Sequence, residues 1–369
     1  MELAELMSLR PVPAAGLLMT VTGRCPLRCA HCSTGSTMAS GEPDAGALLR
    51  FVGSFDAARR PSVLMLTGGE PLLRPALTAR LAARARAVGT RTALLTGAFF
   101  AARRGGGRTG AAGAVVPRAV LRAVEAVDHF SVSVDVHHER EVPRADAFAA
   151  VREVLDAGIA CSFHVVGDGP DDPYLADVTA DIRRSFDDRV PVLVNSLRAV
   201  GRAASWAAAR DTAPPAPGGV LPCAMAAWPV VAADGTVLAC CNQDVVDLRP
   251  APAHLRVGHV AEDDWADVAR RVRSAPVLRM IRAAGPGHLR DRYATGDGGP
   301  RPGYCAGCRT LGEHPEVLAA AERLAGGPAG ALLDLHVTGR QTAAGPAAFV
   351  RRHGSPAHAD LVMLPGDRR

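Results

Sequence analysis

Three cysteines near the beginning of the chain have a spacing suited to an iron–sulfur cluster. They lie in the segment CPLRCAHC as Cys25, Cys29 and Cys32, directly after an aliphatic and β-branched run at 16–22. Three thiolates on one short loop can bind three irons of a cubane cluster, which leaves the fourth iron open to a small ligand. Structural zinc prefers four closed ligands, and His31, between two of the cysteines, has little freedom to complete such a set. The spacing therefore favours a redox-active cluster.

A second group of cysteines lies in the last part of the chain. Asp234-Gly235, shortly before Cys240, predicts a hairpin that presents a thiolate. Cys241 is the alternative to Cys240, because adjacent strand residues point to opposite faces and only one of them can reach a common centre. Four thiolates suit either a second iron–sulfur cluster or structural zinc. The simplest ligand set is Cys223, Cys240, Cys305 and Cys308.

The elements that must position these cysteines alternate in type along the chain. Between the strand-like runs lie segments of helical periodicity, such as Leu48, Val52 and Phe55 at i, i+4 and i+7. Six strands alternating with helices predict right-handed βαβ units and a parallel sheet, in which chemistry collects at the carboxyl ends of the strands. The predicted strands are 16–22, 62–67, 90–96, 129–134, 160–166 and 190–195.

Composition narrows the class of protein. The formal net charge is +5, all of the basic residues are Arg, and they are spread along a chain with only 4% aromatic residues, which argues against a nucleic-acid partner. Nine cysteines without an export signal indicate metal binding rather than a disulfide framework. The sequence has no long uncharged apolar stretch, so we expect a cytoplasmic protein with no membrane association.

The cysteine loop and two further motifs resemble the radical S-adenosylmethionine (SAM) superfamily over roughly residues 16–205. Thr67-Gly68-Gly69-Glu70-Pro71, after the second predicted strand, resembles the family's GGEP motif. Ser133-Val134-Asp135, at the end of the fourth, resembles its Ser-x-Asp motif. The resemblance implies an α/β fold, a partial (β/α)6 TIM-like barrel, with a [4Fe–4S] cluster on the three N-terminal cysteines and SAM bound at its open iron.

The resemblance also implies roles for the motif residues. Glycines allow a ligand's amino group to approach the backbone, and a carboxylate at Glu70 can pair with it. Ser133 would bond the SAM ribose, and His31 occupies the position where the family has an aromatic residue or His near adenine. The expected SAM-binding residues are His31, Gly68, Gly69, Glu70, Pro71, Ser133 and Asp135.

The C-terminal cysteines, together with Trp265, resemble the SPASM and twitch extensions of radical SAM enzymes. The cysteines of a longer form are absent, so the resemblance implies a small α+β domain with a single auxiliary [4Fe–4S] cluster. The Pro-rich segment 212–219 marks the junction before it. The predicted division is a lead-in at 1–15, the radical SAM core at 16–205, the auxiliary domain at 206–315, and a helix with a flexible tail at 316–369.

The implied activity is reductive cleavage of SAM to a 5′-deoxyadenosyl radical that abstracts a hydrogen atom from a substrate. With a second cluster as electron acceptor, the activity that we expect first is a two-electron oxidation of a small metabolite. The early position of Cys25, which leaves no room for an N-terminal peptide-recognition domain, favours a small molecule over a peptide. The alternatives are a crosslink or epimerisation in a ribosomally made peptide and a non-enzymatic iron–sulfur electron carrier. An external donor such as flavodoxin or ferredoxin is the expected partner.

Other polar residues give weaker signals. The run from Asp135 to Arg140 ends the fourth strand at the expected catalytic rim, and Gly201-Arg202-Ala203 resembles a segment of SPASM-type relatives. Arg202 is expected to bind a carboxylate or to support the domain junction. His164 and Cys161 are expected in the core. The sequence identifies neither the substrate nor a catalytic acid or base.

Overall fold

A parallel sheet of six strands forms the first half of the protein. The computed structural model describes residues 1–102, 115–207, 219–295 and 303–367. The strands pair in the order β6-β5-β4-β3-β2-β1, each parallel to its neighbour. All six predicted strands are therefore confirmed to within a few residues. They are β1 (Gly16–Thr22), β2 (Val63–Gly68), β3 (Arg91–Thr96), β4 (His129–Ser133), β5 (Ala160–Gly167) and β6 (Val192–Ser196).

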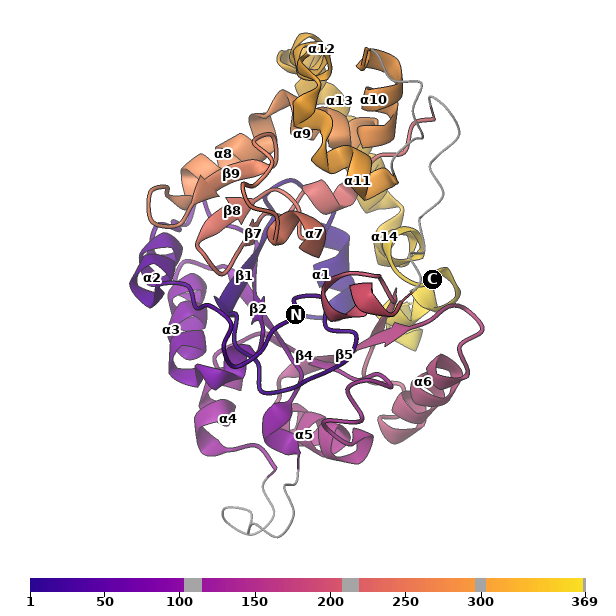
Figure 1. Cartoon of the computed structure of the whole chain (residues 1–369). Helices are drawn as coiled ribbons and strands as arrows, with labels where there is room; N and C mark the ends of the chain where they lie inside the picture. The colour runs from indigo at the N-terminus through magenta and orange to yellow at the C-terminus, as the bar shows by residue number, and fades with distance from the viewer. Residues whose placement is uncertain (103–114, 208–218, 296–302, 368–369) are drawn as a thin grey trace.

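Helices between these strands cover the outer face of the sheet, as Figure 1 shows. Local residues fix where they begin: Asp44 accepts a hydrogen bond from the Ala47 amide before the first of them, and Pro75 occupies the first turn of the next. The alternation of strand and helix gives the expected partial (β/α) barrel. The helices are α2 (Ala45–Gly53), α3 (Pro75–Arg86), α4 (Arg118–Val124), α5 (Arg144–Asp156) and α6 (Pro173–Ser185).

The strands after residue 219 extend the same sheet. Strand β7 (Val230–Val231) pairs parallel to β1, β8 (Thr236–Leu238) pairs antiparallel to β7, and β9 (Arg256–His259) follows. The predicted hairpin at Asp234-Gly235 is confirmed: Gly235 has a φ of 87°, and the Asp234 carboxylate accepts from the Thr236 amide. The cysteine-bearing hairpin is thus joined to the barrel by strand pairing. Nearly all of the Pro-rich segment 212–219 lies outside the described residues.

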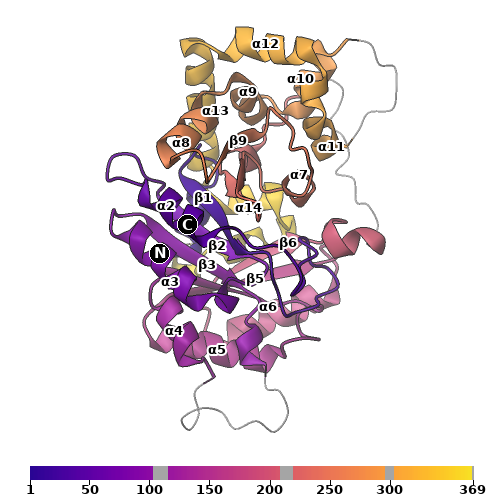
Figure 2. The ribbon, with the colours of Figure 1, turned by 60° about the vertical axis from the view of Figure 1, so that its left-hand side comes forward.

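Short helices cover the far side of this hairpin, above the barrel in Figures 1 and 2. Trp265 is fully buried and contacts Phe51 and Phe55 edge to face, so it fixes the helix that begins at Trp265 against α2. The helices are α7 (Gln243–Val246), α8 (Trp265–Ser274), α9 (Pro276–Ala283), α10 (Pro286–Tyr293), α11 (Tyr304–Arg309) and α12 (Pro315–Ala325).

The last part of the chain is helical, so the prediction of a flexible tail is wrong for the described residues. Helices α13 (Pro328–Ala343) and α14 (Gly345–His353) precede a 3-10 segment at Pro356–Val362. Val350 and Val362 are buried in one cluster with Trp228 and α1 (Leu3–Leu9). A few apolar residues spaced along a Gly- and Ala-rich segment therefore bury enough surface to order it.

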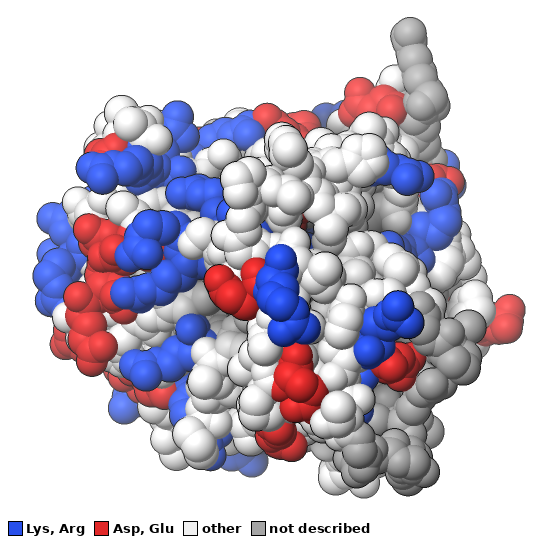
Figure 3. All heavy atoms as spheres, turned by 90° about the horizontal axis from the view of Figure 1, so that it is seen from above, with Lys and Arg blue, Asp and Glu red and all other residues white. Residues whose placement is uncertain are grey.

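The described part of the chain contains no helix long and apolar enough to cross a membrane. On the face seen in Figure 3, Arg side chains are interspersed with Asp and Glu. That face has no continuous basic stripe of the kind that tracks a nucleic-acid backbone.

Candidate active site

The three N-terminal cysteines lie on the loop after β1, close to one another and to Glu70. Cys29 is buried, while Cys25 and Cys32 are half-buried. Burial raises the pKa of Cys25 to about 12, and the charges of Glu70, Cys32 and Cys29 act in the same direction. Such a group of thiols, sheltered from water, fits a metal centre that takes them as thiolates.

Residues after β6 hold this loop in place. Arg202 donates from Nε to the Cys29 carbonyl at 2.9 Å and from Nη1 to the Ser36 carbonyl at 2.7 Å. A Cβ atom at Gly201 would lie 2.4 Å from the Cys32 carbonyl oxygen, so only glycine fits there. The structure thus gives Arg202 a role that the sequence did not: it binds backbone carbonyls of the cysteine loop.

The glycines after β2 also approach the cysteine loop. A Cβ atom at Gly69 would lie 2.3 Å from the Arg24 carbonyl oxygen and 2.5 Å from that of Gly23. The amide of Glu70 donates to the Arg24 carbonyl at 2.8 Å. Gly69 was expected to make room for a ligand's amino group. In the structure its missing side chain instead makes room for the backbone that leads into Cys25.

The substitution Gly69→Ala tests this reading. Its methyl group would push residues 23–24 away and displace Cys25, so we expect less iron after anaerobic reconstitution and SAM affinity lower by about tenfold, or about 1.4 kcal/mol. Gly41→Ala is the matched control, since nothing lies within 4 Å of a Cβ built at Gly41. Equal iron content and SAM affinity in both variants would contradict this role for Gly69.

Glu70 joins the ends of β2 and β3 beneath the cysteine loop. Its carboxylate is buried and accepts hydrogen bonds from the Leu72 amide at 3.0 Å, the Thr96 hydroxyl at 2.8 Å and the Gly97 amide at 2.9 Å. Burial raises the pKa of Glu70 to about 7, while these hydrogen bonds lower it. The Thr96 hydroxyl also lies 2.9 Å from the second carboxylate oxygen, so each oxygen has two polar contacts within the protein.

Asp135 brings two histidines together at the end of β4. Its Oδ2 lies 2.7 Å from Nδ1 of His138 and 3.1 Å from Nε2 of His31. Although burial alone would raise it, hydrogen bonds from both rings hold the pKa of Asp135 well below its usual range. Burial would lower the pKa of His138, but hydrogen bonds with Asp135 and Cys29 raise it to about 10. His138 therefore links a carboxylate to a cysteine of the loop.

Nitrogen and oxygen atoms of His31, Asp135 and His138 all lie within 4.8 Å of one another, a donor set that could also hold a metal ion. Two of the three residues are expected SAM contacts, so this set belongs to the site around the cysteine loop. Sequence reasoning did not single out His138, because a His in a charged loop gives no signal of its own.

Aromatic rings border the same loop. His31 stacks on His137 with ring centroids 4.8 Å apart. The ring centroids of His137 and Trp206 are 5.3 Å apart. The Trp206 Nε1 donates to the Ala30 carbonyl at 3.0 Å. The buried Nδ1 of His31 has no hydrogen-bond partner among the described residues. Trp206 was also missed from the sequence, although a tryptophan is rare in so aromatic-poor a chain.

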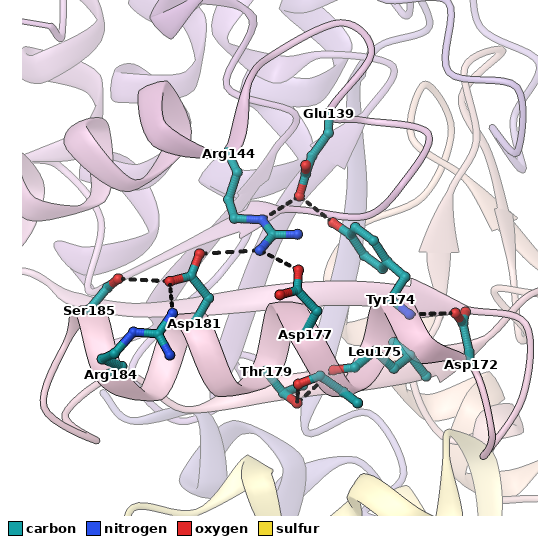
Figure 4. A network of polar contacts seen from close by, with 11 residues as sticks. Glu139, Arg144, Asp172, Tyr174, Leu175, Asp177, Thr179, Asp181, Arg184 and Ser185 are labelled. Carbon is teal, nitrogen blue, oxygen red and sulfur yellow. Dashed lines mark hydrogen bonds and ion pairs between the residues drawn. The ribbon is translucent and has the colours of Figure 1, made fainter.

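An ionic network holds the segment that carries these histidines, as Figure 4 shows. Arg144, at the start of α5, binds Glu139 at 2.5 Å and Asp177 of α6 at 2.7 Å. Tyr174 donates from its hydroxyl to the same Glu139 carboxylate at 2.6 Å. Glu139 directly follows His138, so α5 and α6 together fix the position of the histidine.

Two further residues were expected to contact SAM. Ser133 is the last residue of β4, and Pro71 begins a 3-10 turn after β2.

The C-terminal cysteines lie near one another in the structure, and Cys241 is a neighbour of Cys240 there as well. Burial raises the pKa of Cys308, with the charges of Cys223 and Cys305 acting in the same direction. Burial likewise raises the pKa of Cys240, to which Cys241, Cys223 and Cys308 contribute. The Sγ of Cys241, in contrast, accepts from an arginine, Arg10, at 3.7 Å.

The chain segment that follows β6 also approaches the C-terminal cysteines. Arg198 lies between β6 and the Gly201-Arg202 segment, and its Nη2 is 3.8 Å from Cys305 Sγ. One stretch of chain therefore contacts both cysteine groups.

The structure thus combines a parallel β/α barrel with a three-cysteine loop at the carboxyl end of its first strand. Residues 19–182 match the Radical SAM superfamily. The chain thus contains a radical SAM domain, and enzymes of this superfamily use a [4Fe–4S] cluster and SAM.

Comparison with curated proteins gives no significant match. Among solved structures, the chain is similar to Streptococcus suis SuiB, crystallised with its precursor peptide SuiA, with 12% sequence identity and a TM-score of 0.44. The similarity covers 70% of this chain and 65% of that one.

Proposed function

We propose that this protein cleaves SAM reductively and uses the resulting radical to abstract a hydrogen atom from a bound small metabolite. The observation that carries the proposal is the convergence of Cys25, Cys29 and Cys32 with Glu70 and Asp135 at the carboxyl end of the barrel strands. A [4Fe–4S] cluster there would supply the open iron that binds SAM and the electron that cleaves it.

The protein's own residues would bind and orient SAM. Glu70 would receive the amino group, since its carboxylate lies beside the cysteine loop. Ser133 would bond the ribose, and the stacked rings of His31 and His137 offer a flat surface for adenine. Gly68, Gly69 and Pro71 would act through the backbone, by fixing where Glu70 and the cysteine loop meet.

The C-terminal centre would make the reaction an oxidation. Cys223, Cys240, Cys305 and Cys308 together fit a second [4Fe–4S] cluster, and the contact of Cys241 with Arg10 supports Cys240 as the ligand. A second cluster would supply an acceptor for the electron that remains on the substrate after hydrogen abstraction. Loss of a proton from the substrate would complete a two-electron oxidation.

The experiment that tests the proposal is anaerobic reconstitution of the full chain, followed by reduction with dithionite or reduced flavodoxin in the presence of SAM. We expect 5′-deoxyadenosine as a product, and about eight irons per chain, as two four-iron clusters require. Absence of 5′-deoxyadenosine from protein that holds its iron would identify an electron carrier instead. Metabolite and peptide substrates are then distinguished by which of them increases 5′-deoxyadenosine formation.

The two adjacent cysteines should differ in effect. Cys240→Ala removes an expected ligand, so about half of the iron should be lost while SAM cleavage continues. Cys241→Ala is the matched control and should retain all of the iron. About four irons with one zinc in the wild-type chain would show that the C-terminal centre is structural zinc. Iron loss in Cys241→Ala, but not in Cys240→Ala, would reverse the ligand assignment.

A further inference from the structure

Arg10, which directly follows α1, is a buried cation with unusual partners. Only 6% of the surface of Arg10 is exposed to solvent. The guanidinium lies 4.6 Å from the centroid of the Trp228 ring, and its Nη2 is 3.6 Å from Met225 Sδ and 3.7 Å from Cys241 Sγ. Among the described residues, no carboxylate lies within ion-pair distance of Arg10. Sulfur atoms and an aromatic face are weak partners for a full charge.

Arg282, also buried, shows which kind of partner Arg10 lacks. Arg282 is 2% exposed and binds Asp334 through two hydrogen bonds, at 2.9 and 2.5 Å. A buried charge is costly unless it is paired, and Arg282 satisfies that rule within the protein. Arg10 does not. Its position therefore indicates an anion that the protein part alone does not provide.

The partners of Arg10 indicate where that anion lies. Met225 lies in the 3-10 turn Ala224–Ala226, which Cys223 directly precedes. Cys241 is the neighbour of Cys240, whose charge interacts with those of Cys223 and Cys308. Arg10 thus contacts two of the three chain segments that carry the four cysteines. A metal–thiolate centre on the four cysteines would place negative charge beside these two segments.

We propose that Arg10 is the buried counter-charge of the metal centre held by Cys223, Cys240, Cys305 and Cys308. The inference rests on the proposed function of these four cysteines. A cluster with four thiolate ligands is an anion and becomes more negative on reduction, so a nearby guanidinium stabilises the reduced form more than the oxidised form. Arg10 would therefore raise the reduction potential of this cluster and help it to accept an electron.

The test is a redox titration of the C-terminal cluster alone, in full-length protein whose Cys25, Cys29 and Cys32 are replaced by Ala. Arg10→Met keeps an unbranched side chain against Trp228 and removes the charge. We expect its reduction equilibrium to shift about tenfold toward the oxidised cluster, which is about 59 mV for a one-electron couple. Arg10→Lys should stay near the parent value, and so should Cys241→Ala, which removes the sulfur contact but keeps the charge.

A second measurement separates this role from a structural one. In the metal-free protein Arg10→Met removes an unpaired buried charge, so its urea midpoint should equal or exceed that of the parent. A lower midpoint in the metal-free protein, or an unchanged reduction potential, would overturn the proposal.

If the four cysteines bind zinc instead of iron, the proposed oxidation fails, and the charge proposal is decided by zinc competition against a chelator. Zinc binding about tenfold weaker in Arg10→Met would support the counter-charge. Equal zinc binding would overturn it.

Discussion

A variant with Cys25, Cys29 and Cys32 all replaced by Ala is expected to form no 5′-deoxyadenosine from SAM. The three thiols converge beside Glu70 at the end of β1, and without them no cluster can present an open iron to SAM. About half of the iron and the signal of the C-terminal cluster should remain, because that centre has its own four thiols. Iron analysis and product chromatography measure both effects.

The control for this variant is Cys161→Ala. Cys161 is buried on β5, where its Sγ donates to the Ile159 carbonyl at 3.4 Å, away from both cysteine groups. It should retain full iron content and SAM cleavage. SAM cleavage that survives the triple replacement would contradict the assignment of the N-terminal loop as the catalytic centre.

The variant Asp334→Leu should lower the free energy of unfolding by about 3–5 kcal/mol, because it leaves a buried guanidinium without its partner. Asp334 lies on α13 and binds Arg282 of α9, and both side chains are buried. Urea unfolding of the metal-free protein measures the change. The double variant Arg282→Met with Asp334→Leu should recover much of the loss, since apolar residues can replace a buried ion pair.

An exposed pair provides the comparison. Arg351 and Asp360 are 3.1 Å apart, and their side chains are 53% and 64% exposed. Asp360→Leu should change the free energy of unfolding by no more than about 1 kcal/mol, since solvent screens this pair. A loss in Asp334→Leu no larger than that in Asp360→Leu would show that α13 is held by other contacts.

The barrel could be predicted from the sequence because its signals are local. Aliphatic runs such as 62–67 and 160–166 have the length of buried parallel strands, and turn residues bound them. The cysteine loop could be predicted for a related reason, since its spacing alone restricts the metal. The helical tail could not, because Val350 and Val362 share their buried cluster with Trp228, which is far away in the sequence.

The missed parts of the site depend on three-dimensional neighbours. The sequence indicated a close approach at Gly69 and attributed it to SAM, whereas the close approach of the backbone of residues 23–24 is visible only once the loop is folded. His138 and Trp206 lie on different segments and meet the cysteine loop through contacts with Cys29 and Ala30. Sequence patterns indicate which groups are available, whereas their mutual distances come from tertiary packing.

Strand β6 lies at the end of the sheet, and the position of the segment that covers it has a consequence for synthesis of the protein. The Ser355 amide donates to the Val194 carbonyl at 2.9 Å, so the segment after α14 covers an edge that β5 leaves open. An uncovered strand edge is a template for pairing with other chains. Because residue 355 leaves the ribosome long after residue 194, the nascent barrel exposes this edge until the segment after α14 has been synthesised. A chain truncated before α14 would keep it exposed and would be prone to aggregation.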